Sequence, residues 1–261
     1  MKVETNRIRM NYAVEGEGPW LTMSHSLACN LHMWDEQAAV LAKHFKVLRF
    51  DSRGHGESDA PDGAYSLEML ADDLKGLLEA LGVQETHFVG LSMGGMIGQA
   101  FALKYPGILK TLVLADTTSR YPAEAAAPWA DRIKLAKAQG MEPLVQPTLE
   151  RWFTEPFRKA NAGKMQRIGD MIRATPVAGY VGCSNAIPKI NLTARLKEIE
   201  APALVIVGEQ DAGTPVAMAR EIHENYPGST LVVLRAAAHL SNIEQAEAFN
   251  TALADFLAKH R

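Results

Sequence analysis

A glycine-flanked serine is the part of this sequence whose residue types point most directly to chemistry. Ser92 stands in the pattern Gly90-x-Ser92-x-Gly94, between an apolar run at 86–89 that is typical of a strand and a run at 96–104 that is typical of a helix. Such a tight strand-to-helix turn strains the serine backbone and exposes its hydroxyl, and only glycine fits two residues to either side. The pattern predicts a nucleophilic serine that forms an ester with an acyl group.

A serine hydroxyl is a poor nucleophile near neutral pH, so it needs a base and a carboxylate that orients the base. Two later loops supply candidates, because Asp211 follows a strand expected at 203–208 and His239 follows a strand expected at 230–235. Functional side chains of a parallel sheet collect on the loops at the carboxyl ends of its strands. We therefore predict a triad of Ser92, Asp211 and His239, in this chain order.

Other acids and histidines offer alternatives for these two roles. Asp116 directly follows a strand expected at 109–115 and could supply the carboxylate in a variant site, but its simpler role is to brace the segment that begins there. Glu209 is close to Asp211 in the sequence and is expected to point to solvent. His55 lies in a glycine-rich turn, where bracing the loop is a simpler role than proton transfer.

The chemistry also needs two backbone N–H groups that point at the negative charge developing on the acyl oxygen. Met93 is expected to supply one, because it begins a helix whose N-terminus carries free N–H groups and a positive dipole end. We assign the other to Leu27, in the loop after a strand expected at 20–24. Loss of one such donor typically raises the barrier by roughly 3–4 kcal/mol, so the shape of this loop matters.

Strand-like and helix-like segments that could position these residues alternate along most of the chain. Alternating apolar residues at 8–14 indicate a half-buried strand that pairs with 2–4 in a hairpin. Ser66 can cap a helix that has one apolar stripe and ends at Gly82. Strands that alternate with helices predict a mainly parallel sheet covered on both faces.

The alternation breaks between residues 117 and 196, which are helical in character and rich in proline. We interpret 117–196 as an inserted helical cap, and 1–116 with 197–261 as the core. Trp129 and Trp152 are candidates for the walls of a substrate pocket, with packing inside the cap as the equal alternative. The cap also offers cations for a substrate carboxylate, each expected to be a solvated surface charge: Arg132, Lys134, Arg151 and Arg158.

Composition narrows the classes of function. The 261 residues suit one large α/β domain or a domain with an insertion, and 47% hydrophobic residues suffice for a full core. A net charge of −3 without a basic block predicts no nucleic-acid partner, and no apolar run reaches membrane-spanning length. The first residues form no apolar signal core, and Cys29 and Cys183 are expected to be free thiols without metal-type spacing. We therefore expect a cytoplasmic protein.

The chain resembles the α/β-hydrolase superfamily along nearly its whole length. Four segments carry this resemblance: 51–58, 90–95, 208–211 and 237–239. Within that superfamily the chain is similar to the 3-oxoadipate enol-lactonases of aromatic catabolism. That similarity comes from four features: Ser26-Leu27, Met33-Trp34, the elbow with its following Met96, and the sequence at 239–245.

The resemblance implies an α/β-hydrolase fold, with a mostly parallel eight-stranded sheet, helices on both faces and an inserted helical cap over the site. It implies hydrolysis of a small enol-lactone that carries a carboxylate, without a metal or an organic cofactor. Two departures bear on the acyl pocket. Ser26 stands where most of the superfamily has glycine after the histidine, and Ala28 stands where similar lactonases have glycine.

Other functions fit the same motifs. A broad carboxylesterase or perhydrolase would use the same triad on small acyl esters and would differ only in the cap and the acyl pocket. A non-catalytic binding protein on this scaffold is a third function, against which the intact set of Ser92, Asp211 and His239 argues. Dehalogenases and epoxide hydrolases of this fold carry aspartate at the elbow and dienelactone hydrolases carry cysteine, so Ser92 argues against them. The expected partner is a small ester or lactone.

Overall fold

The computed structural model describes residues 1–260, and these build one mixed β-sheet. The described residues form eight strands in the spatial order β1-β2-β4-β3-β5-β6-β7-β8. The strands are β1 (Lys2–Thr5), β2 (Ile8–Glu15), β3 (Trp20–Ser24), β4 (Lys46–Phe50), β5 (Thr86–Leu91), β6 (Leu109–Ala115), β7 (Ala203–Gly208) and β8 (Thr230–Leu234). β2 pairs antiparallel with β1 and β4, whereas the other neighbours are parallel. The predicted mostly parallel eight-stranded sheet is confirmed.

Burial along the strands explains their residue types. β5 and β7 are buried along their whole length, as expected for apolar parallel strands with helices on both faces. In the first half of β2, by contrast, Ile8 and Met10 are buried while Arg9 is exposed. The predicted hairpin between β1 and β2 is present, and it turns through Asn6 and Arg7, which both have a positive φ.

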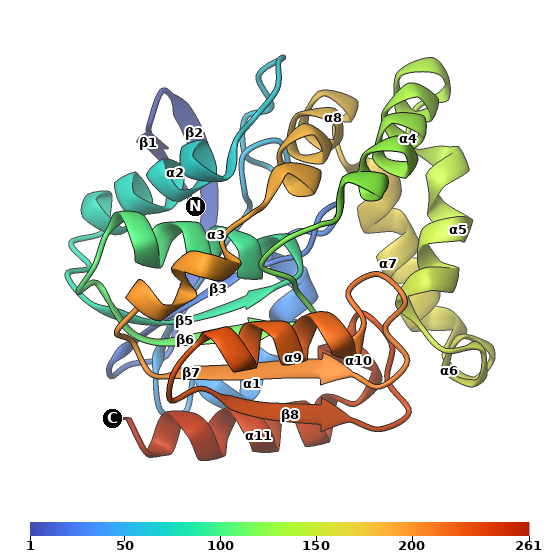
Figure 1. Ribbon diagram of the computed structural model, residues 1–261. Helices are drawn as coiled ribbons and strands as arrows, with labels where there is room; N and C mark the ends of the chain where they lie inside the picture. The colour runs from blue at the N-terminus through green and yellow to red at the C-terminus, as the bar shows by residue number, and fades with distance from the viewer. Residues whose placement is uncertain (261) are drawn as a thin grey trace.

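Helices cover both faces of the sheet, with α2 and α3 on one side and α1 and α11 on the other (Figure 1). Their bounds are α1 (Asp35–Leu41), α2 (Leu67–Ala80), α3 (Met93–Lys104), α9 (Val216–Asn225), α10 (Ser241–Glu244) and α11 (Ala246–Ala258). The predicted cap of α2 is confirmed, because the Ser66 hydroxyl accepts the N–H of Met69 at 3.1 Å. A 3-10 turn over Leu31–Trp34 precedes α1.

Between β6 and β7 the chain leaves the sheet and forms a group of helices beyond the carboxyl ends of the strands (Figure 1). These are α4 (Ala126–Gln139), α5 (Glu142–Trp152), α6 (Glu155–Ala160), α7 (Ala162–Ala174) and α8 (Val177–Ala186). Within this group α4 packs against α8, and α5 packs against α7. The helical character predicted for 117–196 is therefore present.

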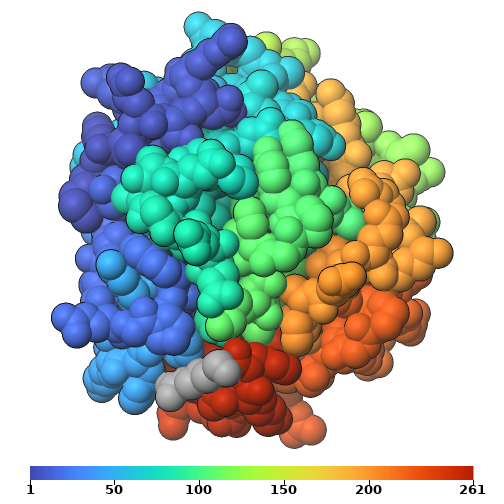
Figure 2. Space-filling view, turned by 90° about the vertical axis from the view of Figure 1, so that its left-hand side faces the viewer, coloured from blue at the N-terminus to red at the C-terminus, as the bar shows by residue number. Residues whose placement is uncertain are grey.

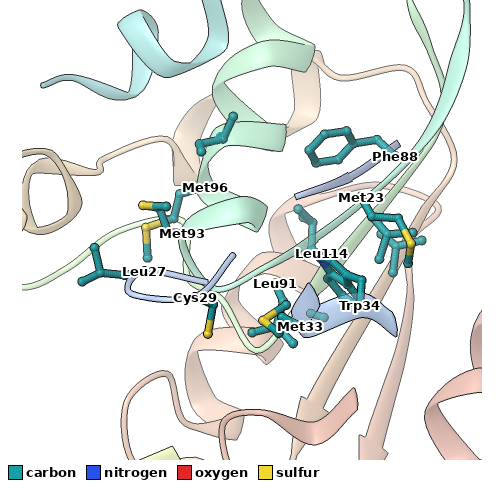
Figure 3. Packing of buried hydrophobic residues seen from close by; sticks show 14 of the residues in the cluster. Met23, Leu27, Cys29, Met33, Trp34, Phe88, Leu91, Met93, Met96 and Leu114 are labelled. Carbon is teal, nitrogen blue, oxygen red and sulfur yellow. The ribbon is translucent and has the colours of Figure 1, made fainter. Parts of the chain in front are cut away.

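One continuous apolar core supports both the sheet and the site. In Figure 3, Leu27, Met93 and Met96 gather at one end of this core; they come from the loop after β3 and from α3. Figure 2 shows the face away from the carboxyl ends of the strands, where the first strands and the last helix both reach the surface.

The structure also bears on the cysteines, on membrane-spanning helices and on groups of metal-ligating side chains. Cys29 and Cys183 are both buried and unpaired, as predicted. Within residues 1–260, no helix combines the length and the apolar character needed to cross a membrane. In the same range, no three or more His, Cys, Asp or Glu side chains are grouped so that they could hold a metal ion.

Candidate active site

Ser92 lies at the sharp turn between β5 and α3, with φ 56° and ψ −114°. Such a left-handed conformation costs of order 1–3 kcal/mol for a residue other than glycine, so neighbours must hold it. The Ser92 N–H donates to the Ala115 carbonyl at 2.9 Å, and the Thr117 hydroxyl donates to the Ser92 carbonyl at 2.7 Å. A Cβ on Gly90 would lie 2.3 Å from the Gly94 carbonyl oxygen, which explains the glycine there.

The imidazole of His239 lies between Ser92 and Asp211. Its Nε2 is 2.9 Å from Ser92 Oγ, and its Nδ1 is 2.8 Å from Asp211 Oδ2. Both distances are those of hydrogen bonds, and they meet the geometric requirement for a nucleophile, a base and a group that orients the base. The structure thus brings together the three residues predicted from the sequence. The arrangement can move the Ser92 proton to His239 while Asp211 balances the resulting charge.

The carboxylate of Asp211 is held by its own loop. Its Oδ1 accepts the N–H groups of Gly213 at 2.7 Å and Thr214 at 3.0 Å, and its Oδ2 accepts the Thr214 hydroxyl at 2.7 Å. The sequence analysis missed Thr214. The spacing Asp-x-x-Thr after a strand was the available signal, because aspartate commonly bonds to backbone groups two or three residues ahead in turns.

Burial and mutual attraction compete in setting the pKa values of this pair. Burial opposes the ionisation of Asp211, but the charge of His239 and the bonds from Thr214 hold the pKa of Asp211 below its usual range. Burial likewise disfavours the charged form of His239, but attraction to Asp211 outweighs it and raises the pKa of His239. A raised pKa makes the imidazole a stronger base towards the serine proton.

The two predicted oxyanion donors lie beside the serine. Leu27 lines the same cavity as Ser92, and its N–H forms no hydrogen bond with any residue in the range 1–260. Met93 is the first residue of α3, so its N–H has no acceptor within the helix. Figure 3 shows both residues at the same end of the core. Two free N–H groups here suit a developing oxyanion, and the role of each stays a prediction.

A cavity of about 220 Å³ opens beside Ser92 and His239. The core contributes the loop after β3, the loop after β7 and the side chains of Ser92, Met96 and His239 to its lining, and the segment 117–196 contributes the rest. Trp129 and Trp152, the two predicted pocket residues, both line it. Eight further residues from 117–196 complete that wall: Tyr121, Ala125, Pro128, Arg132, Thr148, Arg151, Tyr180 and Ile187. Contact between the tryptophans and a substrate stays a prediction.

Two arginines give this cavity a positive charge. The Arg132 guanidinium lies 4.8 Å from the centre of the Trp129 ring, and Arg151 Nη2 donates to the Thr148 hydroxyl at 3.2 Å. No Asp or Glu of residues 1–260 lines the cavity, and burial together with the charge of Arg132 lowers the pKa of Arg151. The expectation of solvated surface charges is therefore wrong for these two residues, because the fold turns their side chains inward.

The other two cations of that group lie elsewhere. Lys134 is exposed, as expected for a solvated charge. Arg158 is half-buried and pairs with Glu150 at 3.9 Å, and it lines a different hollow between α5 and α7. Only spatial folding could separate these two from the cavity-lining arginines, since all four stand in similar helical sequence.

Comparisons with known proteins identify the family of this chain. A family described as the alpha/beta hydrolase fold matches residues 19–246. The chain belongs to the α/β-hydrolase fold family. Two relatives from Acinetobacter baylyi are the 3-oxoadipate enol-lactonases 2 and 1, which are 36% and 30% identical; each comparison covers 94% of this chain and 92% of the relative. A putative carbamate hydrolase from Stutzerimonas stutzeri is 29% identical over 96% of this chain and 97% of its own.

Solved structures extend the comparison to three dimensions. An enol-lactonase from Burkholderia xenovorans LB400 superimposes with a TM-score of 0.96 at 36% identity, covering 99% of this chain and 100% of that one. A thermophilic esterase from Thermogutta terrifontis gives 0.95 at 29% identity, covering 100% and 99%. The resemblance predicted from the motifs is confirmed, and the protein is a hydrolase of the α/β family.

Two buried histidines of this hydrolase brace the loop that contains Leu27. His55 Nε2 accepts the N–H of Ala28 at 3.0 Å, which matches the bracing role predicted for it. His25 Nε2 accepts the N–H of Ser52 at 2.9 Å, a role that the sequence analysis missed. Burial lowers the pKa of His25 to about 4 and, with the help of His25, that of His55 to about 3. Both rings therefore accept these bonds in the neutral form.

The alternative acids lie outside the chain of bonds from the serine. Asp116 makes no hydrogen bond to His239 among the described residues; instead it accepts from Gly208 N–H and the Ser241 hydroxyl. Glu209 is exposed, as predicted. Of these three acids, Asp211 is therefore the one whose carboxylate contacts His239.

Proposed function

We propose that this hydrolase opens a small lactone ring that carries a carboxylate, by way of an ester on Ser92. The observation that supports the proposal is the chain of hydrogen bonds from Ser92 through His239 to Asp211, at the wall of a cavity with two arginines and no acidic side chain from residues 1–260. The specific substrate that we infer is 3-oxoadipate enol-lactone, the compound named in two relatives at 36% and 30% identity.

The reaction begins when Ser92 Oγ attacks the lactone carbonyl carbon and His239 Nε2 takes the hydroxyl proton. The N–H groups of Leu27 and Met93 stabilise the tetrahedral oxyanion. When this intermediate collapses, the bond to the ring oxygen breaks, and that oxygen leaves as an enol with the proton from His239. Water then attacks the ester with His239 as base, and Ser92 regains its proton as the acid is released.

We assign recognition of the substrate carboxylate to Arg132 and Arg151. Guanidinium groups bind carboxylates with two parallel hydrogen bonds, and a half-buried arginine without an acidic partner leaves its donors free for a ligand. The hydroxyls of Thr148 and Tyr180 stand in the same wall and can add to this subsite. The similar Thermogutta terrifontis esterase is described with malate bound, which is also a small carboxylate.

We also propose that 117–196 is a cap on a core made of 1–116 and 197–261. Its helices supply the arginines and tryptophans of the cavity, so the cap selects the acyl group while the core supplies the chemistry. The cytoplasmic location expected from the sequence belongs to this proposal, and cell fractionation tests it.

A broad carboxylesterase or perhydrolase is the second candidate, because an esterase at 29% identity has nearly the same fold. The deciding experiment measures kcat/KM for 3-oxoadipate enol-lactone and for p-nitrophenyl acetate, with Ser92→Ala as the blank. We expect a strong preference for the lactone, and a kcat at least roughly 10⁴-fold lower in Ser92→Ala. Good turnover of the ester alone would favour the second candidate. A Ser92→Ala variant that keeps most of its activity would refute the serine mechanism.

A further inference from the structure

Asp116 carries a buried carboxyl that takes no part in the acyl transfer proposed above. It is fully buried at the end of β6, and its backbone has a left-handed φ of 44°. Its N–H donates to the Ile206 carbonyl at 2.8 Å, so the residue continues the pairing of β6 with β7. A buried carboxyl destabilises the fold unless its oxygens are hydrogen-bonded, so Asp116 needs a partner for each oxygen.

The two oxygens of Asp116 bond to the two loops that carry the base and its acid. Oδ1 accepts the N–H of Gly208 at 2.8 Å, three residues before Asp211. Oδ2 accepts the hydroxyl of Ser241 at 2.5 Å, two residues after His239. The carboxyl therefore bridges the loops whose separation sets the 2.8 Å bond between Asp211 and His239.

These loops are packed too closely to tolerate a change in that bridge. A Cβ added to Gly208 would lie 2.1 Å from the Ala238 carbonyl oxygen, so the backbone of one loop rests directly on the other. The N–H of Gln210 also donates to the Ala237 carbonyl at 2.8 Å. The side chain of Asp116 adds a hydrogen bond on the other side of His239, to Ser241 at the start of α10.

We propose that Asp116 is a positioning residue, which holds the loops of Asp211 and His239 in register through its two hydrogen bonds. The proposal rests on the triad of the proposed function and adds a fourth residue to it. Asp116 acts through the backbone of the two loops, without touching the serine or the substrate.

The surroundings of the Asp116 carboxyl favour its neutral form. Burial and the negative charge of Asp211 raise the pKa of Asp116 above its usual range, and the opposing attraction to His239 is smaller. Two more titratable groups interact with Asp211 and His239. The charge of Arg151 lowers the pKa of His239, and burial together with the charge of Asp211 raises the pKa of Tyr121. When Asp116 is protonated, Oδ2 can donate its proton to Ser241 Oγ across the same contact, so the bond between the two residues is kept. When Asp116 ionises, the same hydroxyl donates instead.

Asp116→Asn is the test of this role, because asparagine has the same shape and cannot ionise. Its amide oxygen can accept from Gly208 and its NH₂ can donate to Ser241. We expect kcat/KM for p-nitrophenyl acetate within about threefold of wild type at pH 7. We also expect the variant to lose a titration step that wild type shows above neutral pH. Asp116→Ala removes both bonds, and we expect kcat to fall about 10- to 100-fold while KM stays within about twofold.

Matched variants separate positioning from a general loss of stability. Thr22→Val breaks a buried hydroxyl pair with Thr86 between β3 and β5, so it should lower the unfolding midpoint and leave the pH profile unchanged. An Asp116→Asn variant as damaged as Asp211→Asn would overturn the proposal, since Asp116 would then have to be ionised. An Asp116→Ala variant with wild-type kcat would also overturn it.

Labelling of Ser92 by a fluorophosphonate keeps this test independent of the natural substrate. The labelling rate reports activation of the serine, and it can be followed against pH in each variant. If wild type is not labelled, the proposed serine mechanism fails, whatever Asp116 does. If wild type is labelled and Asp116→Ala is labelled just as fast, the mechanism stands and the positioning role fails.

Discussion

The indole of Trp152 lies against the imidazole of His239, with ring centroids 6.1 Å apart and ring planes inclined by 30°. The Trp152 carbonyl also accepts the N–H of Leu240 at 3.1 Å, so the end of α5 is joined to the loop of the base by a ring contact and by the backbone. The sequence left two roles open for Trp152, pocket wall and packing. The structure shows both, because the residue is buried and lines the cavity.

Removal of the Trp152 ring should make the imidazole of His239 more mobile. We expect Trp152→Ala to lower kcat/KM for p-nitrophenyl acetate about tenfold, in line with the 0.5–1.5 kcal/mol that an aromatic pair typically contributes. Trp152→Phe keeps a ring against His239 and should restore most of the activity. Steady-state kinetics of the two variants check this, and equal rates in Ala, Phe and wild type would show that the ring contact is irrelevant.

Loss of charge at Asp211 should be far more damaging than the same change at Asp116. We expect Asp211→Asn to lower kcat roughly 10⁴-fold, because His239 loses its orienting acceptor and the charge that stabilises its imidazolium form. Since Asp211 raises the pKa of His239, the acid limb of kcat/KM in wild type should lie above the ordinary histidine value of about 6.5 and move lower in the variant. The reverse order of damage would assign the acid to position 116.

The arginines of the cavity should matter only for a charged substrate. Arg151→Met keeps much of the length and apolar bulk of the side chain and removes its charge. We expect KM for the carboxylate-bearing lactone to rise roughly 10- to 100-fold, the effect of losing hydrogen bonds to a charged group. The neutral p-nitrophenyl acetate should be unaffected. Arg158→Met is the control, because Arg158 pairs with Glu150 outside this cavity. Equal losses on both substrates would contradict the carboxylate subsite.

The buried pair His25 and His55 should make the fold sensitive to acid. Their pKa values are about 4 and about 3 in the fold, because burial disfavours the charged rings. Both should titrate near 6.5 in the unfolded chain. Below about pH 6.5 the unfolded chain therefore binds more protons than the folded protein does. The contribution of the two neutral histidines to the free energy of unfolding is complete above that pH and is lost as the pH falls towards 4 and 3.

Urea unfolding between pH 7 and pH 4.5 measures this dependence. His55→Gln can keep an acceptor for Ala28 without titrating, so its unfolding free energy should fall less steeply than that of wild type as the pH decreases. His44→Gln, at an exposed position away from this loop, is the matched control for the substitution itself. An unchanged slope in His55→Gln would show that the buried ring is not the source.

Much of this protein could be predicted from local sequence. The apolar runs of the strands and the pattern around Ser92 are short-range signals, since strand periodicity and a tight strand-to-helix turn each depend on neighbouring residues. Asp211 and His239 could be found because parallel strands collect their following loops at one edge, so position after a strand implies position in space. These features together determined the sheet, the family and the three residues that we propose as the triad.

The remaining features were decided by the tertiary structure. Whether Arg151 faces water or the cavity depends on how α5 packs over the strands, and whether Asp116 serves as an acid or a brace depends on where Gly208 and Ser241 lie. The bond of His25 to Ser52 likewise joins residues far apart in the sequence. A charged or polar side chain has no periodic signal of its own, because its role is set by distant partners that only folding brings within hydrogen-bond distance.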